Sequence, residues 1–207
     1  MPKEKLSGKL FILSGPSGAG KGTICSQLLR ETDVELSVSM TTRSPRTGEI
    51  DGISYYFVTR EGFLKTIEEE GFLEYAQVYG NYYGTPKEPV LRKLAAGIDV
   101  ILEIDMQGAL QVKENFPQGV FIFILPPSMA ELRKRLTGRG TETAAAIEMR
   151  LGETLKELSY IDKYDYCVVN GKLEEAVARV KSIVIAEHSK VTFTAEELIS
   201  KYKEEEV

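Results

Sequence analysis

The run Lys9-Leu-Phe-Ile-Leu-Ser14, followed at once by Gly15-Pro-Ser-Gly-Ala-Gly-Lys21, decides the fold of this chain. The first run is short and apolar, which is typical of a buried strand, and apolar residues recur at helical spacing over 24–30. The glycine-rich segment between them fits the pattern G-x-x-x-x-G-K of a phosphate-binding loop, in the strand, loop and helix context that this pattern requires. A plain glycine turn would explain the glycines but not the lysine, so the sequence predicts a phosphate site here.

The chemistry of this predicted loop comes from its backbone. Glycines allow positive φ angles and carry no Cβ, so successive N–H groups can turn around a phosphate at the start of a helix. Lys21 adds a mobile positive charge for the terminal phosphates of a nucleoside triphosphate. The predicted triphosphate-binding residues of this segment are Gly15, Pro16, Ser17, Gly18, Ala19, Gly20, Lys21, Gly22 and Thr23.

Further apolar runs alternate with amphipathic segments of helix length. The runs span Asp99–Ile104, Val120–Leu125 and Tyr166–Val169, and the helical segments span 89–96, 106–114 and 129–136. Continuous apolar strands alternating with helices are typical of a parallel sheet covered on both faces. We therefore expect a three-layer α/β fold with a phosphate-binding loop.

Two stretches interrupt this alternation. Residues 36–85 hold aromatic and alternating segments with turn signals, which predict an insertion made of a small antiparallel sheet and a helix at 61–70. Residues 137–146, TGRGTETAAA, have the composition of a mobile flap. The resulting division is a core of 1–35, 86–127 and 158–207, an insertion of 36–85 and a lid of 128–157.

The composition excludes several classes of protein. The chain has 207 residues, 43% of them hydrophobic, so it can bury a core without disulfides or metals. Lysine plus arginine number 26 against 31 acidic residues, a net charge of −5 that argues against a nucleic-acid coat or a basic membrane patch. Two cysteines without a CxxC pattern and a single histidine offer no zinc framework. With no long apolar run, these features predict a cytoplasmic protein.

The insertion contains two groups of residues suited to a second substrate. Arg43 and Arg46 lie three apart beside several hydroxyls in the run 39–49, and guanidinium forks with hydroxyls suit a monoester phosphate. The run 72–85 mixes a carboxylate and hydroxyls with aromatic residues. For Tyr56, Tyr75 and Tyr82 we expect packing within the insertion.

Seven segments in this order resemble the guanylate kinases, which phosphorylate GMP from ATP: GPSGAGKG, SMTTRSPRTGE, EYAQVYGNYYGT, LEIDMQG, IFILPPS, RLTGRGTET and VVN. The resemblance implies a GMP site formed by Ser39, Arg43, Arg46, Tyr55, Glu74, Tyr83, Thr85 and Asp105. It also implies that Arg135, Arg139 and Arg150 contact the triphosphate and the phosphoryl group in flight, and that Asn170 approaches the adenine of ATP, although a turn asparagine is a rival interpretation. The catalytic residues implied are Lys21, Arg43, Arg139 and Arg150.

The chemistry of guanine supports a base-reading role for Glu74. An ionised carboxylate only accepts hydrogen bonds, so it satisfies the donors at N1 and N2 of guanine and opposes the acceptor at N1 of adenine. Such a mismatch discriminates on the order of thousands-fold in a closed site. Ser39 and Thr85 can donate to O6. This leaves four residues for the phosphate of GMP: Arg43, Arg46, Tyr55 and Tyr83.

One position departs from the loop pattern. Residue 22 is glycine where the pattern has serine or threonine, so no hydroxyl at 22 can bind magnesium. The Mg²⁺ that accompanies ATP is then held by Thr23 or by nucleotide oxygens and water. Asp105 ends a predicted strand and has two open roles, near guanine or, like Glu103, in a water contact to the metal. The Asp-x-x-Gly pattern at 105–108 also occurs in GTPases, but their Asn-Lys-x-Asp motif is absent.

Phosphoryl transfer needs positioning and positive charge rather than a base, because the attacking group is already an anionic phosphate oxygen. Arginines on a flap would arrive only when both nucleotides are bound, which excludes water. ATP and GMP are the expected partners, with neither nucleic acid nor membrane. The alternatives are a non-catalytic guanylate-kinase-like interaction module and a kinase for another nucleoside monophosphate. Cys25 and Cys167 are expected to be buried, and His188 to be structural or exposed.

Overall fold

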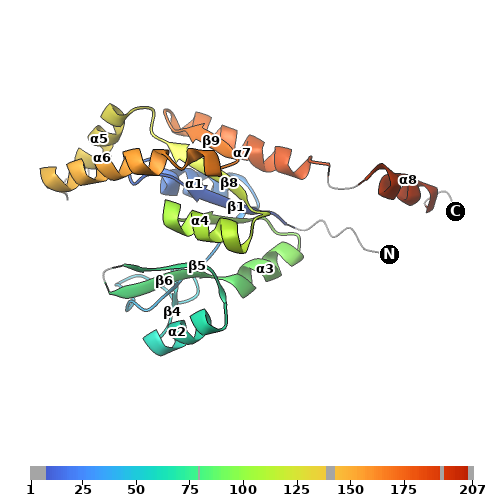
Figure 1. Cartoon of the computed structure of the whole chain (residues 1–207), viewed down its shortest axis with the longest axis horizontal. Helices are drawn as coiled ribbons and strands as arrows, with labels where there is room; N and C mark the ends of the chain where they lie inside the picture. The colour runs from blue at the N-terminus through green and yellow to red at the C-terminus, as the bar shows by residue number, and fades with distance from the viewer. Residues whose placement is uncertain (1–7, 79, 139–142, 192–193, 205–207) are drawn as a thin grey trace.

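A computed structural model describes residues 8–78, 80–138, 143–191 and 194–204 of the chain (Figure 1). Strand β1 (Leu10–Ser14) forms the centre of a five-stranded sheet in the order β2-β7-β1-β8-β9, and all of its pairs are parallel. The other strands are β2 (Glu35–Leu36), β7 (Val100–Glu103), β8 (Val120–Leu125) and β9 (Tyr166–Val169). The expected α/β class with a parallel sheet is confirmed.

Both faces of this sheet are covered by helices, which explains the continuous apolar strands. Phe11 and Leu13 point to one face and pack in the cluster that includes residues of α1 (Lys21–Glu31) and α7 (Leu173–His188). Leu10 and Ile12 point to the other face and pack with residues of α3 (Lys87–Ala95) and α4 (Met106–Asn115). All four side chains are at most 1% exposed, so β1 lies at the core of the molecule.

The carboxyl ends of the parallel strands meet at one edge of the sheet, where ligands bind in open α/β folds. The predicted phosphate loop follows β1 there, and Gly20 caps α1 with a φ of 91°. Asp105 follows β7 and caps α4, because its carboxylate accepts the main-chain N–H of Gly108 at 2.8 Å. Asn170 follows β9 at the same edge.

The insertion forms a second sheet in the order β4-β3-β6-β5. Its strands are β3 (Met40–Thr41), β4 (Tyr56–Phe57), β5 (Phe72–Val78) and β6 (Asn81–Pro86). The prediction of an antiparallel sheet is wrong for one pair, because β3 and β4 are parallel. The long connection between them carries the arginine-rich loop and returns the chain in the same direction, which a tight hairpin cannot do.

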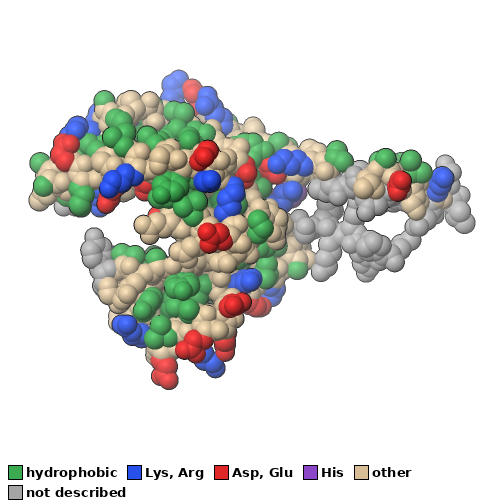
Figure 2. Space-filling view, in the orientation of Figure 1, with side chains coloured by type: hydrophobic (Ala, Val, Ile, Leu, Met, Phe, Trp, Pro, Cys, Tyr) green, Lys and Arg blue, Asp and Glu red, His purple; other side chains and the backbone are tan. Residues whose placement is uncertain are grey.

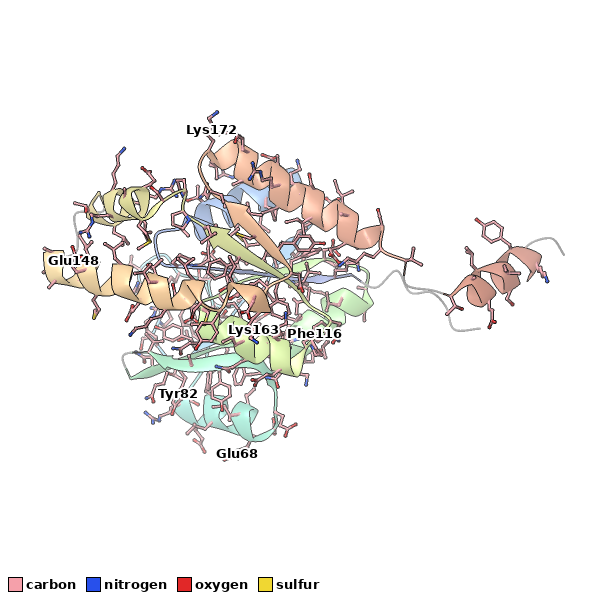
Figure 3. All side chains as sticks on the ribbon, turned by 45° about the horizontal axis from the view of Figure 1, so that its top comes forward. Glu68, Tyr82, Phe116, Glu148, Lys163 and Lys172 are labelled. Atoms are coloured by element: carbon pink, nitrogen blue, oxygen red, sulfur yellow. The ribbon has the colours of Figure 1, made fainter. Side chains whose placement is uncertain are left out.

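Helix α2 (Arg60–Glu68) covers the insertion sheet. It begins where the Thr59 hydroxyl accepts the N–H of Gly62. The buried ring of Phe63 stacks on Phe72 at a centroid distance of 4.4 Å and on Tyr82 at 5.3 Å. Tyr82 therefore packs within the insertion as expected, and Figure 3 shows its place beside α2.

Two further helices, α5 (Met129–Thr137) and α6 (Ala144–Leu158), pack through Leu132, Leu136, Ile147 and Leu151. They extend into the segment predicted as a flap, so only 138–143 separates them. Residues 139–142, and with them the predicted site residue Arg139, lie outside the described residues.

A short 3₁₀ turn (Ile161–Lys163) precedes β9, and the last helix is α8 (Ala195–Glu204). Within the described ranges, none of the helices combines the length and apolar character needed to cross a bilayer.

Candidate active site

The loop after β1 has the geometry of an anion cradle. Gly15, Gly18 and Gly20 have φ angles of 139°, 87° and 91°, which side chains with a Cβ rarely adopt. A Cβ on Gly15 would lie 2.3 Å from the carbonyl oxygen of Ile124, and one on Gly20 would lie 2.3 Å from Nδ2 of Asn170. Gly15 and Gly20 must therefore be glycine for two reasons: the backbone conformation and the lack of space for a Cβ.

Lys21 lies at the first turn of α1 and folds back over this loop. Its Nζ donates to the main-chain oxygens of Gly15 at 2.5 Å and Pro16 at 3.2 Å. The ammonium group is thus held over the glycine-rich loop. Its charge also acts on Glu103, where burial raises the pKa of the carboxyl and the neighbouring Lys21 opposes that rise.

The glycine at position 22 has a structural explanation. A Cβ on Gly22 would lie 3.1 Å and 3.4 Å from the two carboxylate oxygens of Glu103. The carboxylate therefore fills the space that a serine or threonine side chain would need. Thr23 is exposed. Among the described residues, no group of three or more His, Cys, Asp or Glu side chains could hold a metal ion.

On the insertion, Arg43 is held by Glu49, which is not among the predicted site residues. The Arg43 guanidinium pairs with the carboxylate of Glu49 and lies over the rings of Tyr55, at 5.6 Å, and Phe57, at 5.9 Å. The hydrogen bond with Glu49 raises the pKa of Arg43, and a hydrogen bond with Tyr83 adds a smaller contribution. The hydrogen bond with Arg43 in turn lowers the pKa of Glu49. The sequence signal for this contact is the spacing Arg-x-x-Arg-x-x-Glu, which places Glu49 on the same loop as Arg43 and Arg46.

Two carboxylates, those of Glu74 and Asp105, lie close to Gly108 where the insertion meets α4. The Thr85 hydroxyl donates to Oε1 of Glu74 at 2.6 Å, and Glu74 is buried at 8% exposure. Burial raises the pKa of Glu74, and the nearby charge of Asp105 raises it further. A Cβ on Gly108 would lie 3.1 Å from Oε2 of Glu74 and 3.5 Å from Oδ1 of Asp105, so this glycine makes room for both.

A cavity of about 160 Å³ lies between the insertion and the parallel sheet. Its lining includes Ser39, Tyr55 and Thr85 from the insertion and Glu103 from the parallel sheet. Figure 2 shows the surface hollowed between the parallel-sheet part and the insertion. Of the predicted acceptor residues, Ser39, Tyr55 and Thr85 therefore face the carboxyl end of β7 across this cavity, whereas the Arg46 side chain is exposed on its own loop.

Comparison with known proteins agrees with this arrangement. The sequence model of the family described as guanylate kinase matches residues 7–187. The chain belongs to the guanylate kinase family. A guanylate kinase of Clostridium acetobutylicum is 57% identical over 184 residues, which cover 89% of this chain and 88% of that protein. One of Caldanaerobacter subterraneus subsp. tengcongensis is 54% identical over 204 residues, 98% of each chain.

A solved structure supports the same assignment. The crystal structure of guanylate kinase from Anaplasma phagocytophilum has a TM-score of 0.70 and 38% sequence identity, and the match covers 89% of this chain and 88% of that one. Fold and family therefore agree.

In this guanylate kinase family member, the helices α5 and α6 bring arginines to the phosphate loop. Nη1 of Arg150 donates to the Ser17 hydroxyl at 2.8 Å. Arg135 donates from Nη2 to the main-chain oxygen of Asn170 at 2.9 Å. Arg133 instead pairs with Glu148 on the exposed surface of α5 and α6, and Figure 3 labels Glu148 there.

The remaining predictions concern cysteine and histidine. Cys25 is buried, and burial raises its pKa to about 12. The expectation for Cys167 is wrong, because it lies on the edge strand β9 with its side chain exposed. His188 is structural, since its Nε2 lies 2.7 Å from the carboxylate of Asp99 and ties the end of α7 to the start of β7.

Proposed function

We propose that this chain transfers the terminal phosphoryl group of ATP to GMP, giving ADP and GDP. One observation carries the proposal: the phosphate loop with Lys21 and the pocket with Glu74 and Thr85 open to the same end of the parallel sheet. The cavity lined by Ser39, Tyr55 and Thr85 also reaches Glu103, whose carboxylate lies against Gly22 of the loop. Two nucleotides bound in these positions would present their phosphates to each other.

The donor site is the loop 15–23. Its N–H groups bind the triphosphate oxygens, and the Lys21 ammonium exchanges its main-chain partners for the terminal phosphates. Arg150 is held next to the loop through Ser17. Together with Arg139, it would add positive charge where charge develops in the transition state.

The acceptor site reads guanine through Glu74. The buried carboxylate accepts hydrogen bonds from the side chain and the backbone of Thr85, and guanine N1 and N2 would supply further donors that compensate its burial. Ser39 and Thr85 line the cavity. The Ser39 hydroxyl would donate to O6, whereas the single Thr85 hydroxyl proton is donated to Glu74. Arg43, Arg46, Tyr55 and Tyr83 bind the phosphate of GMP.

Glu103 and Asp105 divide between the two sites. Asp105 caps α4 and adjoins Glu74, so it belongs to the acceptor side. Glu103 lies against Gly22 of the phosphate loop, where it would hold Mg²⁺ through water. Magnesium commonly uses one or two carboxylates together with substrate phosphates and water, so this donor set fits the ion. Bound there, Mg²⁺ would neutralise phosphate charge.

The transfer itself needs no general base. The attacking oxygen of GMP is already anionic, so the chain contributes alignment, positive charge and exclusion of water. We propose that the insertion, 36–85, and the lid, 128–157, close over the core to bring the two phosphates into line.

A screen of nucleoside monophosphates against ATP and Mg²⁺, read as ADP release, tests this function. We expect release that depends on GMP and is far weaker with AMP. ADP release that ignores added GMP, or none with any acceptor, would reject the enzyme and favour a non-catalytic interaction module. Equal rates with another monophosphate would reject the base-reading role of Glu74.

A further inference from the structure

The main-chain carbonyl of Ala19, in the middle of the phosphate loop, is held by two side chains from other segments, one after β9 and one on α5. Nδ2 of Asn170 donates to this oxygen at 2.8 Å, and Nη1 of Arg135 donates to it at 3.4 Å. Arg135 also donates from Nη2 to the main-chain oxygen of Asn170 at 2.9 Å. Ala19, Asn170 and Arg135, which we call the carbonyl clamp, thus form a closed hydrogen-bonded group.

The clamp fixes the orientation of one peptide group. The bond between Ala19 and Gly20 is trans, and in a planar trans peptide the C=O and N–H point in opposite directions. Holding the carbonyl of Ala19 toward Asn170 and Arg135 therefore turns the N–H of Gly20 away from these two side chains. In a phosphate-binding loop the main-chain N–H groups face the phosphate, and a peptide fixed in this way has its N–H free to do so.

The clamp rests on rigid supports. The main-chain N–H of Asn170 donates to the carbonyl of Leu125 at 2.7 Å, which ties it to the end of β8. Leu132 of α5 is fully buried, and a Cβ on Gly18 would lie 2.8 Å from its side chain. Because α5 packs directly on the loop, Arg135 is carried by a helix that is fixed to the loop it contacts.

Burial and its contact with Ala19 favour a role for Asn170 in the loop over a base-reading role. The residue is 6% exposed, and its amide nitrogen already has a partner in Ala19. It also fills the space beside Gly20, where a Cβ would lie 2.3 Å from Nδ2. A side chain with these contacts acts on the shape of the loop, which is common to every triphosphate.

We propose that Asn170 and Arg135 are positioning residues for the triphosphate, acting through the peptide between Ala19 and Gly20 and not through the adenine of ATP. The proposal rests on the donor role of the phosphate loop given above. A pre-oriented N–H binds phosphate without reorganisation, whereas an unclamped peptide must be ordered on binding.

Inorganic tripolyphosphate, which has no base, separates these roles. Asn170→Ala removes the donor without adding charge, and we expect the dissociation constants of Mg²⁺-tripolyphosphate and Mg²⁺-ATP to rise together, about five- to tenfold. Calorimetry, with competition between the two ligands, measures both. The matched control is Asn115→Ala, because Asn115 likewise donates from its amide to a main-chain oxygen, that of Leu73, away from the loop.

A second pair of variants covers the case in which Asn170→Ala fails to fold. Arg135→Lys keeps the charge but loses the fork, and Arg133→Lys makes the same change on the surface of α5. We expect only the first to weaken tripolyphosphate, with GMP binding unchanged in both. Weakening of ATP alone would overturn the proposal and assign Asn170 to the adenine. If the wild-type chain bound neither ATP nor GMP, the proposed function itself would fail.

Discussion

The Glu49 carboxylate accepts two hydrogen bonds from Nη2 of Arg43, at 2.8 Å to Oε1 and 3.0 Å to Oε2. Its Oε2 also accepts the main-chain N–H of Arg46 at 2.7 Å. One carboxylate therefore ties together the two arginines proposed to bind the phosphate of GMP. The side chains of Arg43 and Glu49 are only 14% and 22% exposed, so the pair is screened less than a surface ion pair.

Replacing Glu49 by Gln should raise KM for GMP about five- to twentyfold and change kcat less, because Arg43 loses its orientation before the phosphate binds. Steady-state kinetics with saturating ATP measures the split. Glu69→Gln is the control in the same insertion, since Glu69 pairs with Lys65 on the exposed surface. An unchanged KM for GMP in Glu49→Gln would refute a positioning role.

Replacing Glu74 by Gln should stabilise the ligand-free protein while weakening GMP binding. Burial and the charge of Asp105 raise the Glu74 pKa above its ordinary value of 4.5. The protonated Glu74 carboxyl favours the folded protein. This contribution to the free energy of unfolding is fully present below pH 4.5 and is lost as pH rises through the raised pKa. The neutral variant has no such loss, so at pH 7 its melting temperature should exceed that of the wild type by about 1–3 °C.

Thermal unfolding from pH 4 to pH 8 checks this sign: the difference between Glu74→Gln and the wild type should grow with pH. Calorimetry should show weaker GMP binding and a smaller preference over AMP. A wild type that is the more stable protein throughout this range would contradict the prediction.

Replacing Gly22 by Ala should stabilise α1 and slow turnover. Alanine is favoured over glycine inside a helix by roughly 0.5–1 kcal/mol. Its Cβ would lie 3.1 Å from Oε1 of Glu103, which must move by a few tenths of an ångström. We expect a raised melting temperature and a kcat reduced about three- to tenfold at saturating Mg²⁺. Unchanged turnover would show that the position of Glu103 is irrelevant to the reaction.

Replacing Lys21 by Ala should lower kcat by about 100- to 1000-fold, because the ammonium charge on the transferred phosphoryl group is lost. GMP binding should persist, since Glu74 and Arg43 belong to the insertion. Calorimetry with GMP alone provides the control. If GMP affinity fell in parallel, the loss of turnover would reflect disrupted structure.

The two thiols should differ in reactivity. Burial raises the pKa of Cys25 to about 12, whereas Cys167 is exposed, although partial burial raises its pKa as well. Iodoacetamide at pH 8 should therefore modify Cys167 in the native protein and leave Cys25 intact until the chain unfolds. Mass spectrometry of peptides containing each cysteine measures this, and native modification of Cys25 would contradict its burial.

Local sequence was sufficient for the glycine-rich loop and for β1, β7, β8 and β9, but not for the short strand β2 (Glu35–Leu36). The conformations of Gly15 and Gly20 depend on steric contacts between neighbouring atoms, and the buried strands are visible as continuous apolar runs. The insertion was predicted in outline, but the parallel pairing of β3 and β4 was not, because nothing local records the path of a long connection.

The partners of the site residues depended on tertiary structure. Asn170 and Ala19 are 151 residues apart, and they meet because β9 ends beside the loop that follows β1. Glu103 comes to lie against Gly22 because β7 pairs with β1. Glu74 comes near Asp105 because β5 of the insertion packs against α4, which Asp105 caps. Sequence determined which side chains could bind phosphate and guanine. Packing of the sheet edges determined which of them touch, since a contact between remote residues depends on register and topology, which no short pattern encodes.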